Sequence, residues 1–186
     1  MYRCLVISLI FSTGTAGILL TNGDFEEPFT EGWLETRSGF NTAFQRATNY
    51  DPDPDYEAYV YKGSDHGFAR LHQITNIGDM PVTEIDFSVW AKLYAYDNDP
   101  EAFTGAAVEL MYLDETGSYL GNTKICARST QCPWTNTLTQ HIIPASGSGW
   151  YNYSFNINDE LGNLPGVSPA DVKKIKVSLL DSTYHC

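Results

Sequence analysis

Hydrophobic and polar residues alternate with the period of a β-strand along much of the chain, and short turn sequences separate these runs. The clearest run covers residues 83–96, where every second residue from Ile85 to Ala95 is apolar. Because successive strand residues point to opposite faces, we expect these apolar residues to face a core. The other face carries Trp90, Tyr94 and Tyr96 among polar residues, which predicts a surface that touches a ligand or another protein.

Turn sequences rich in Gly, Asn, Asp and Pro divide the rest of the chain into pieces of strand length. We expect strands near residues 18–22, 40–48, 57–62, 67–75, 82–96, 104–113, 118–125, 138–143, 149–157 and 175–181. The one helical signal is Ser168 as an N-cap before Pro169. Many short strands with little helix predict a single all-β domain over residues 18–186, built as an antiparallel β-sandwich.

The first 17 residues allow two interpretations. A charged start, an apolar stretch over residues 4–11 and small residues at 13–17 have the layout of a secretory signal peptide. The same stretch is rich in β-branched residues, which is typical of a strand that stays in the protein. Both interpretations, a signal peptide and a retained donor-strand segment, stay open at this point.

Three short motifs resemble carbohydrate-binding modules of families 4, 9 and 22, which are jelly-roll, galactose-binding-like sandwiches. The motifs are residues 22–26 (NGDFE) with Gly32-Trp33, residues 149–155 (GWYNYSF) and residues 172–177 (VKKIKV). The resemblance implies a jelly-roll-like order of strands. It also implies a structural calcium ion held by Glu26, with Asp24 beside it, through the oxygen ligands that calcium prefers.

In such a jelly-roll the first strand pairs with the last, and the chain ends before the strand that the resemblance places there. We therefore expect a sandwich that lacks its last strand, with an open edge at residues 18–21 that can accept a strand from a neighbour. Four apolar residues of the front would be donated: Leu5, Ile7, Leu9 and Phe11. Head-to-tail donation between copies of the chain would build a filament. It would also bring Cys4 of one copy near Cys186 of the next, which predicts an intersubunit disulfide.

Charge and cysteine usage narrow the class of protein. Lys plus Arg number 11 against 23 Asp plus Glu, a net charge of −12, which disfavours nucleic acid and anionic membrane surfaces as partners. The apolar run at residues 4–11 is far shorter than the roughly 20 residues of a membrane-spanning helix. Cys126 and Cys132 enclose a short loop, and this spacing predicts a disulfide in a secreted or cell-surface protein.

An aromatic surface supplies the second candidate function, because flat amphipathic rings suit sugar rings. Its candidate glycan-binding residues are Tyr59, Tyr61, Trp90, Tyr94 and Tyr96. The alternative is that this face packs under a loop or against a neighbouring subunit. Asn152 begins a sequon for N-glycosylation.

No known catalytic motif is present, and the four histidines are scattered without metal-ligand spacing, so we expect no enzyme. The sequence thus favours a structural subunit of an extracellular assembly. A secreted carbohydrate-binding module is the alternative, and an adhesion domain of a longer cell-surface protein comes third.

Overall fold

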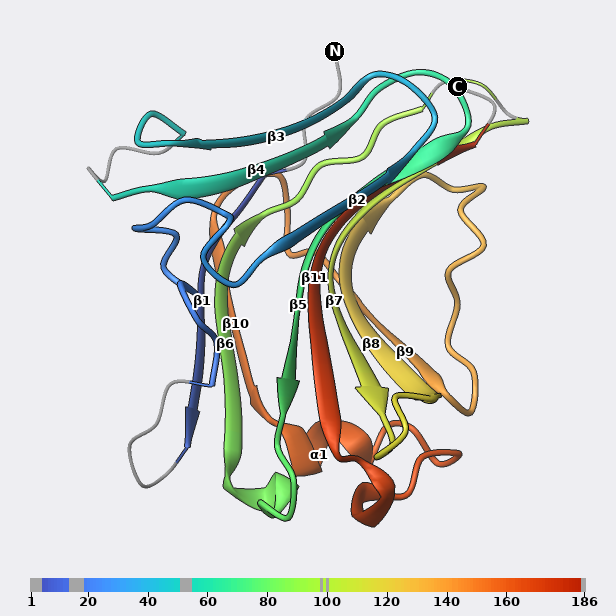
Figure 1. The fold of residues 1–186 in the computed structure, drawn as a ribbon. Helices are drawn as coiled ribbons and strands as arrows, with labels where there is room; N and C mark the ends of the chain where they lie inside the picture. The colour runs from blue at the N-terminus through green and yellow to red at the C-terminus, as the bar shows by residue number, and fades with distance from the viewer. Residues whose placement is uncertain (1–4, 14–18, 51–54, 98, 100, 185–186) are drawn as a thin grey trace.

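The fold is an all-β sandwich of two sheets (Figure 1). The computed structural model describes residues 5–13, of which it gives the backbone, and residues 19–50, 55–97, 99 and 101–184. Sheet A has the strand order β10-β6-β1-β4-β3 and sheet B the order β2-β5-β11-β7-β8-β9. Sheet A consists of β1 (Leu5–Thr13), β3 (Thr42–Ala47), β4 (Glu57–Lys62), β6 (Ile85–Lys92) and β10 (Tyr151–Asn156). Sheet B consists of β2 (Leu34–Ser38), β5 (Gly67–Asn76), β7 (Phe103–Leu113), β8 (Tyr119–Arg128), β9 (Gln140–Pro144) and β11 (Lys174–Tyr184).

Helical structure in the described part of the chain is confined to short pieces. They are α1 (Ile157–Leu161) and two 3-10 turns, η1 (Val82–Glu84) and η2 (Pro169–Asp171). The Asn156 side chain caps α1 by accepting a hydrogen bond from the Asn158 N–H. Ser168 precedes the 3-10 turn as predicted, but its side chain makes no capping bond. None of the described helices is long and apolar enough to cross a membrane.

The core lies between the two sheets, and the alternation seen in the sequence accounts for it. On β6, Phe87 and Val89 are buried and face the other sheet, while Trp90 is 52% exposed. On β11, Val177 and Leu179 are buried in the same hydrophobic cluster. The apolar face predicted for residues 85–95 is therefore confirmed from Ile85 to Leu93, whereas Ala95 is only half-buried.

Residues 19–22 do not form the strand that the sequence predicts. Side chains of β5 take up the backbone polar groups of this segment instead: Gln73 Oε1 accepts from the Thr21 N–H at 2.8 Å, and the Thr75 hydroxyl donates to the Leu19 carbonyl at 3.1 Å. The segment consequently needs no strand partner. The open strand edge expected at residues 18–21 is not found at residues 19–21, and residue 18 lies outside the described residues. The last strand, β11, instead lies inside sheet B, between β5 and β7.

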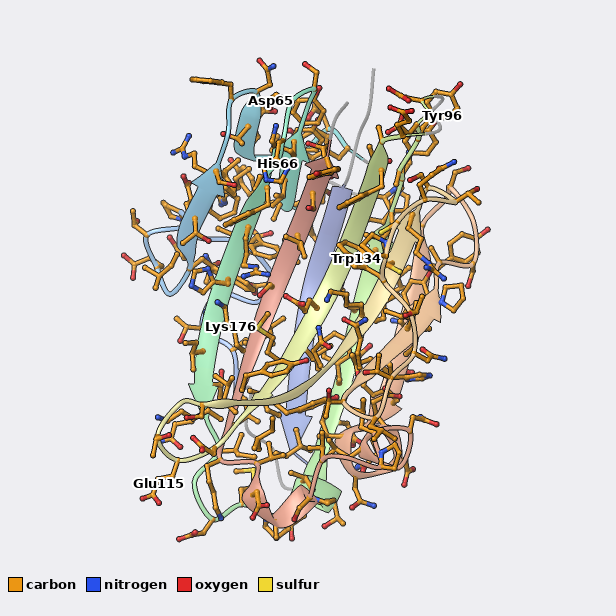
Figure 2. The ribbon with its side chains drawn as sticks, turned by 90° about the vertical axis from the view of Figure 1, so that its right-hand side faces the viewer. Asp65, His66, Tyr96, Glu115, Trp134 and Lys176 are labelled. Atoms are coloured by element: carbon orange, nitrogen blue, oxygen red, sulfur yellow. The ribbon has the colours of Figure 1, made fainter. Side chains whose placement is uncertain are left out.

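All strand pairs are antiparallel except β8 and β9, which are parallel. Parallel neighbours need a connection that returns from one end of the sheet to the other. Residues 129–139 make this return. Figure 1 shows the loop standing off the outer side of the curved sheet B. We call the side of sheet B that faces away from the core its outer face, and Figure 2 looks onto it.

Candidate functional site: the pairing of β1 with β6

The N-terminal strand β1 lies inside sheet A, between β6 and β4. It pairs antiparallel with β6 along its whole length, from Leu5 opposite Lys92 to Thr13 opposite Ile85. Its pairing with β4 is much shorter and consists of Leu5 opposite Tyr59 and Val6 opposite Ala58. The position of β1 thus depends mainly on β6.

The other side of β6 is paired with β10, from Tyr151 opposite Ala91 to Asn156 opposite Asp86. Removal of β1 would leave one side of the β6 backbone without its strand partner, next to the core. Unpaired backbone N–H and C=O groups at such a place are costly and act as a template for another strand. The edge of β6 that faces β1 is therefore a site that requires an extended segment.

The four predicted donor residues fall into two pairs along β1. Leu5 and Ile7 stand opposite Lys92 and Trp90, which lie on the outward side of β6. After a register shift between Ile7 and Leu9, Leu9 and Phe11 stand opposite the core residues Val89 and Phe87. Donation of this segment between copies stays a prediction.

Three of the predicted glycan-binding residues share the outward face of sheet A, because Tyr59 and Tyr61 alternate with core residues on β4 as Trp90 does on β6. They do not form one flat platform. The rings of Tyr59 and Tyr61 stack on each other with centroids 6.1 Å apart, and Tyr50 stacks on Tyr59 at 5.4 Å. The stacked ring faces meet one another, and β1 separates them from Trp90.

Tyr94 and Tyr96 follow the end of β6. Tyr94 lines a pocket of about 330 Å³ together with Arg128 of β8 and Ser148. Tyr96 is 48% exposed.

Cys126 and Cys132 are both buried and carry free thiols, so the predicted disulfide is not present in the structure. The loop is held in other ways: the Cys132 N–H donates to the Ser129 carbonyl at 3.1 Å, and the Arg128 guanidinium donates to the carbonyls of Cys132 and Trp134. Burial raises the pKa of the Cys126 thiol to about 11, which keeps it protonated and unreactive at neutral pH. The predicted partners Cys4 and Cys186 lie outside the described residues.

Asp24 and Glu26, the calcium candidates, line an acidic pocket of about 630 Å³ with Asn22, Glu27 and Glu31. A cation of the chain itself lies beside this loop, because the Arg46 guanidinium donates to the backbone carbonyls of Phe25 and Glu26. The Glu26 carboxylate accepts from the Tyr56 N–H at 3.0 Å. The described residues contain no group of three or more side chains arranged to hold a metal ion. Arg46 takes oxygens that calcium would use, and a calcium ion at this loop stays a prediction.

Asn152 is exposed on β10, and its amide donates to the Ser88 hydroxyl at 3.2 Å. Its glycosylation stays a prediction.

The structure shows three clusters of buried polar residues that the sequence did not predict. The first surrounds the ammonium of Lys62, which contacts Asp65 and the carbonyls of the following turn. The second joins the Glu160 carboxylate to His141 at 2.6 Å and to the Thr123 hydroxyl at 2.7 Å. The third is centred on Glu109. A sequence signal existed for it, since Glu109 is the one charged residue in the strand FTGAAVELMYL.

No protein-family model matches the chain, and no curated protein matches it. Among solved structures, the enzymatically active domain of tailspike protein 4 from bacteriophage CBA120 is similar, with a TM-score of 0.49 and 12% sequence identity. The similarity covers 88% of this chain and 19% of the tailspike chain. At this level the likeness carries no argument about function.

Proposed function

We propose that the chain is a structural subunit of an extracellular polymer in which β1 of one copy pairs with β6 of the next. The supporting observation is that β1 pairs with β6 from Leu5 to Thr13 and with β4 only at Leu5 and Val6, so that its place in sheet A depends mainly on backbone pairing with β6. A strand from another copy would make the same backbone pairs. Exchange between identical elements therefore needs no new contact surface.

Head-to-tail exchange of this kind produces open chains of subunits when the rotation from one copy to the next does not close a ring. Cys4 would travel with β1, so its predicted disulfide with Cys186 of a neighbour belongs to the same proposal. The proposal assigns no catalytic group. That the chain is not an enzyme, and that it acts outside the cell, both stay predictions.

Truncation tests the proposal. The full chain and a variant that begins at residue 14 are compared by light scattering after size exclusion and by negative-stain electron microscopy. We expect elongated assemblies from the full chain, and from the truncated chain monomers that bind a synthetic peptide of residues 1–13 but not a scrambled peptide. A full chain that stays monomeric at every concentration, or a truncated chain that assembles equally well, would overturn the proposal.

Polysaccharide binding is a second candidate, and the exposure of Trp90 favours it. A tryptophan that is 52% exposed on a strand offers a ring face to a sugar, whereas Tyr59 and Tyr61 have theirs stacked together. If Trp90→Ala abolishes retention on a polysaccharide column and leaves the oligomeric state unchanged, the aromatic face binds glycans. Retention that is equal for the Trp90→Ala variant and the parent would exclude this role.

A further inference from the structure

A row of polar residues crosses the middle of the outer face of sheet B. The strand register places His72 of β5, Ser178 of β11, Glu109 of β7 and Lys124 of β8 side by side in that order. All four are buried, although they lie on the side of the sheet away from the core. Figure 2 shows this face, with Lys176 and Trp134 both lying on it.

Glu109 is the centre of this row. Its carboxylate accepts from Arg70 Nη2 at 3.1 Å, from Lys124 Nζ at 2.9 Å and from the Asn122 amide at 2.9 Å. Lys176 is a third cation. It lies on β11, two residues before Ser178 and on the same face of the strand. It forms no ion pair with any residue that the structure describes. Three cations thus surround one carboxylate, in a chain whose net charge is −12.

Three polar atoms of this cluster are buried without a hydrogen-bond partner among the described residues: Arg70 Nε, His72 Nδ1 and the Ser178 hydroxyl. Such atoms are rare in folded proteins, and each one costs free energy. Here they come from two adjacent strands and from one region of a single face. Arg70 already gives Nη2 to Glu109, so its Nε–H remains available to an acceptor.

Burial, together with the positive charge of the cluster, lowers the pKa values of two of its residues, His72 and Lys176. Burial first, and then the charges of Lys176 and Arg70, lower the pKa of His72 to about 4. The pKa of Lys176 is lowered too, first by burial and then by Arg70, while Glu109 opposes the shift. Near neutral pH, His72 is therefore neutral, and the cations repel one another.

We propose that this part of the outer face of sheet B binds a small oxyanion, such as a phosphate or carboxylate group, beside Arg70, Ser178 and Lys176. The guanidinium Nε–H and the serine hydroxyl would donate hydrogen bonds, and the lysine ammonium would supply charge. Arg70 and Lys176 are half-buried and form the rim of the site, and their long side chains would have to move for an anion to reach the buried Nε–H and the serine hydroxyl. The bound anion would offset the repulsion between them.

Inorganic phosphate is a suitable probe. It is titrated into the 15N-labelled full chain at constant ionic strength, with sodium chloride as the matched titration. We expect saturable shifts of the amide signals of Arg70, His72 and Lys176 with phosphate and not with chloride. A second titration with glucose 6-phosphate distinguishes the sources of the oxyanion. Binding tighter than that of inorganic phosphate would mean that the oxyanion is part of a larger ligand, and equal binding would indicate the free ion. Absence of saturable shifts, or equal shifts with chloride, would overturn the proposal.

Two lysines of β11 provide a matched pair of variants. Lys176→Gln should weaken phosphate binding about tenfold or more, because it removes a charge-assisted contact. Lys174 lies on the same face of the same strand, but its ammonium donates to the Glu115 carbonyl at 2.8 Å. Lys174→Gln should therefore leave phosphate binding unchanged. Phosphate should also raise the pKa of His72, measured from its ring proton signals. Equal weakening in both variants would show a general charge effect and would contradict a site.

Discussion

Among the carboxylates on the outer face of sheet B, Glu109 is the one whose removal should lower the free energy of unfolding most. It is 1% exposed and pairs with both Arg70 and Lys124. Removing one partner of a buried ion pair leaves uncompensated charge behind, so we expect Glu109→Ala to lower the free energy of unfolding by about 3 kcal/mol. Urea denaturation measures this loss. Glu115→Ala, at an exposed turn, is the control and should change stability by less than about 0.5 kcal/mol.

Asp181 should make stability depend on pH in a direction opposite to that of most carboxylates. Burial raises its pKa to about 7, and the hydrogen bond from the Lys62 N–H, 2.8 Å long, opposes this only in part. The folded chain then holds this proton more tightly than the unfolded chain, whose aspartate has a pKa of about 3.9. The stabilisation is complete at low pH and is lost as the pH rises from about 4 to about 7.

Asp181→Asn isolates this effect, because the amide stays neutral and its oxygen can still accept from the Lys62 N–H. Urea denaturation of parent and variant is compared between pH 4 and pH 8. We expect the stability of the parent to fall relative to that of the variant by on the order of 3 kcal/mol across this range. Parallel stability curves would show that Asp181 keeps an ordinary pKa.

At the scale of elements, a close contact between Trp134 and Gly105 is one of several that hold the return loop of residues 129–139 against sheet B. A Cβ added at Gly105 of β7 would lie 2.7 Å from the ring of Trp134. Gly105→Ala should therefore push Trp134 away and lower stability by about 1–3 kcal/mol. Hydrogen exchange of the loop amides should become faster.

Gly149→Ala is the matched control for this change, because its added Cβ would meet Tyr151 at 3.6 Å, an ordinary contact. Unchanged exchange of residues 129–139 in Gly105→Ala would mean that Trp134 does not hold the loop.

Strands with a regular alternation could be predicted from the sequence, whereas the irregular elements could not. The pattern placed β4, β5, β6 and β7 within a few residues of their bounds. It missed β2, because the residues LETRS are all exposed and show no apolar alternation, although they pair with β5. It assigned a strand to residues 18–22. Residues 19–22 form no strand, because two distant side chains, Gln73 and Thr75, bond to the backbone of this segment.

For the whole molecule, the sequence predicted the class of fold but not the order of strands. Pairing of β11 with β5 and β7 joins segments far apart in the chain, and local periodicity carries no information about such partners. The same holds for the candidate sites: the exposed Trp90 could be predicted, but the cluster around Glu109 needs four strands in register. The Arg46 guanidinium beside the 22–26 loop likewise comes from β3, which the motif does not include.

At the scale of the whole molecule and its neighbours, we propose that β1 of one copy pairs with β6 of another. Register places Ile10 of β1 opposite Ser88 of β6. Directly opposed residues of antiparallel strands have Cα atoms about 4.5–5.5 Å apart, within the range of a disulfide. The variant with Ile10→Cys and Ser88→Cys can therefore report which copy supplies the strand, once Cys4, Cys126, Cys132 and Cys186 are replaced by serine or alanine.

The most direct measurement is a non-reducing gel of this double variant after mild oxidation of the assembled protein, beside the two single-cysteine variants. We expect a ladder of covalent oligomers from the double variant, and no species larger than a dimer from either single variant. A double variant that closes its disulfide within one chain, and runs as a monomer at every protein concentration, would contradict exchange of β1 between copies.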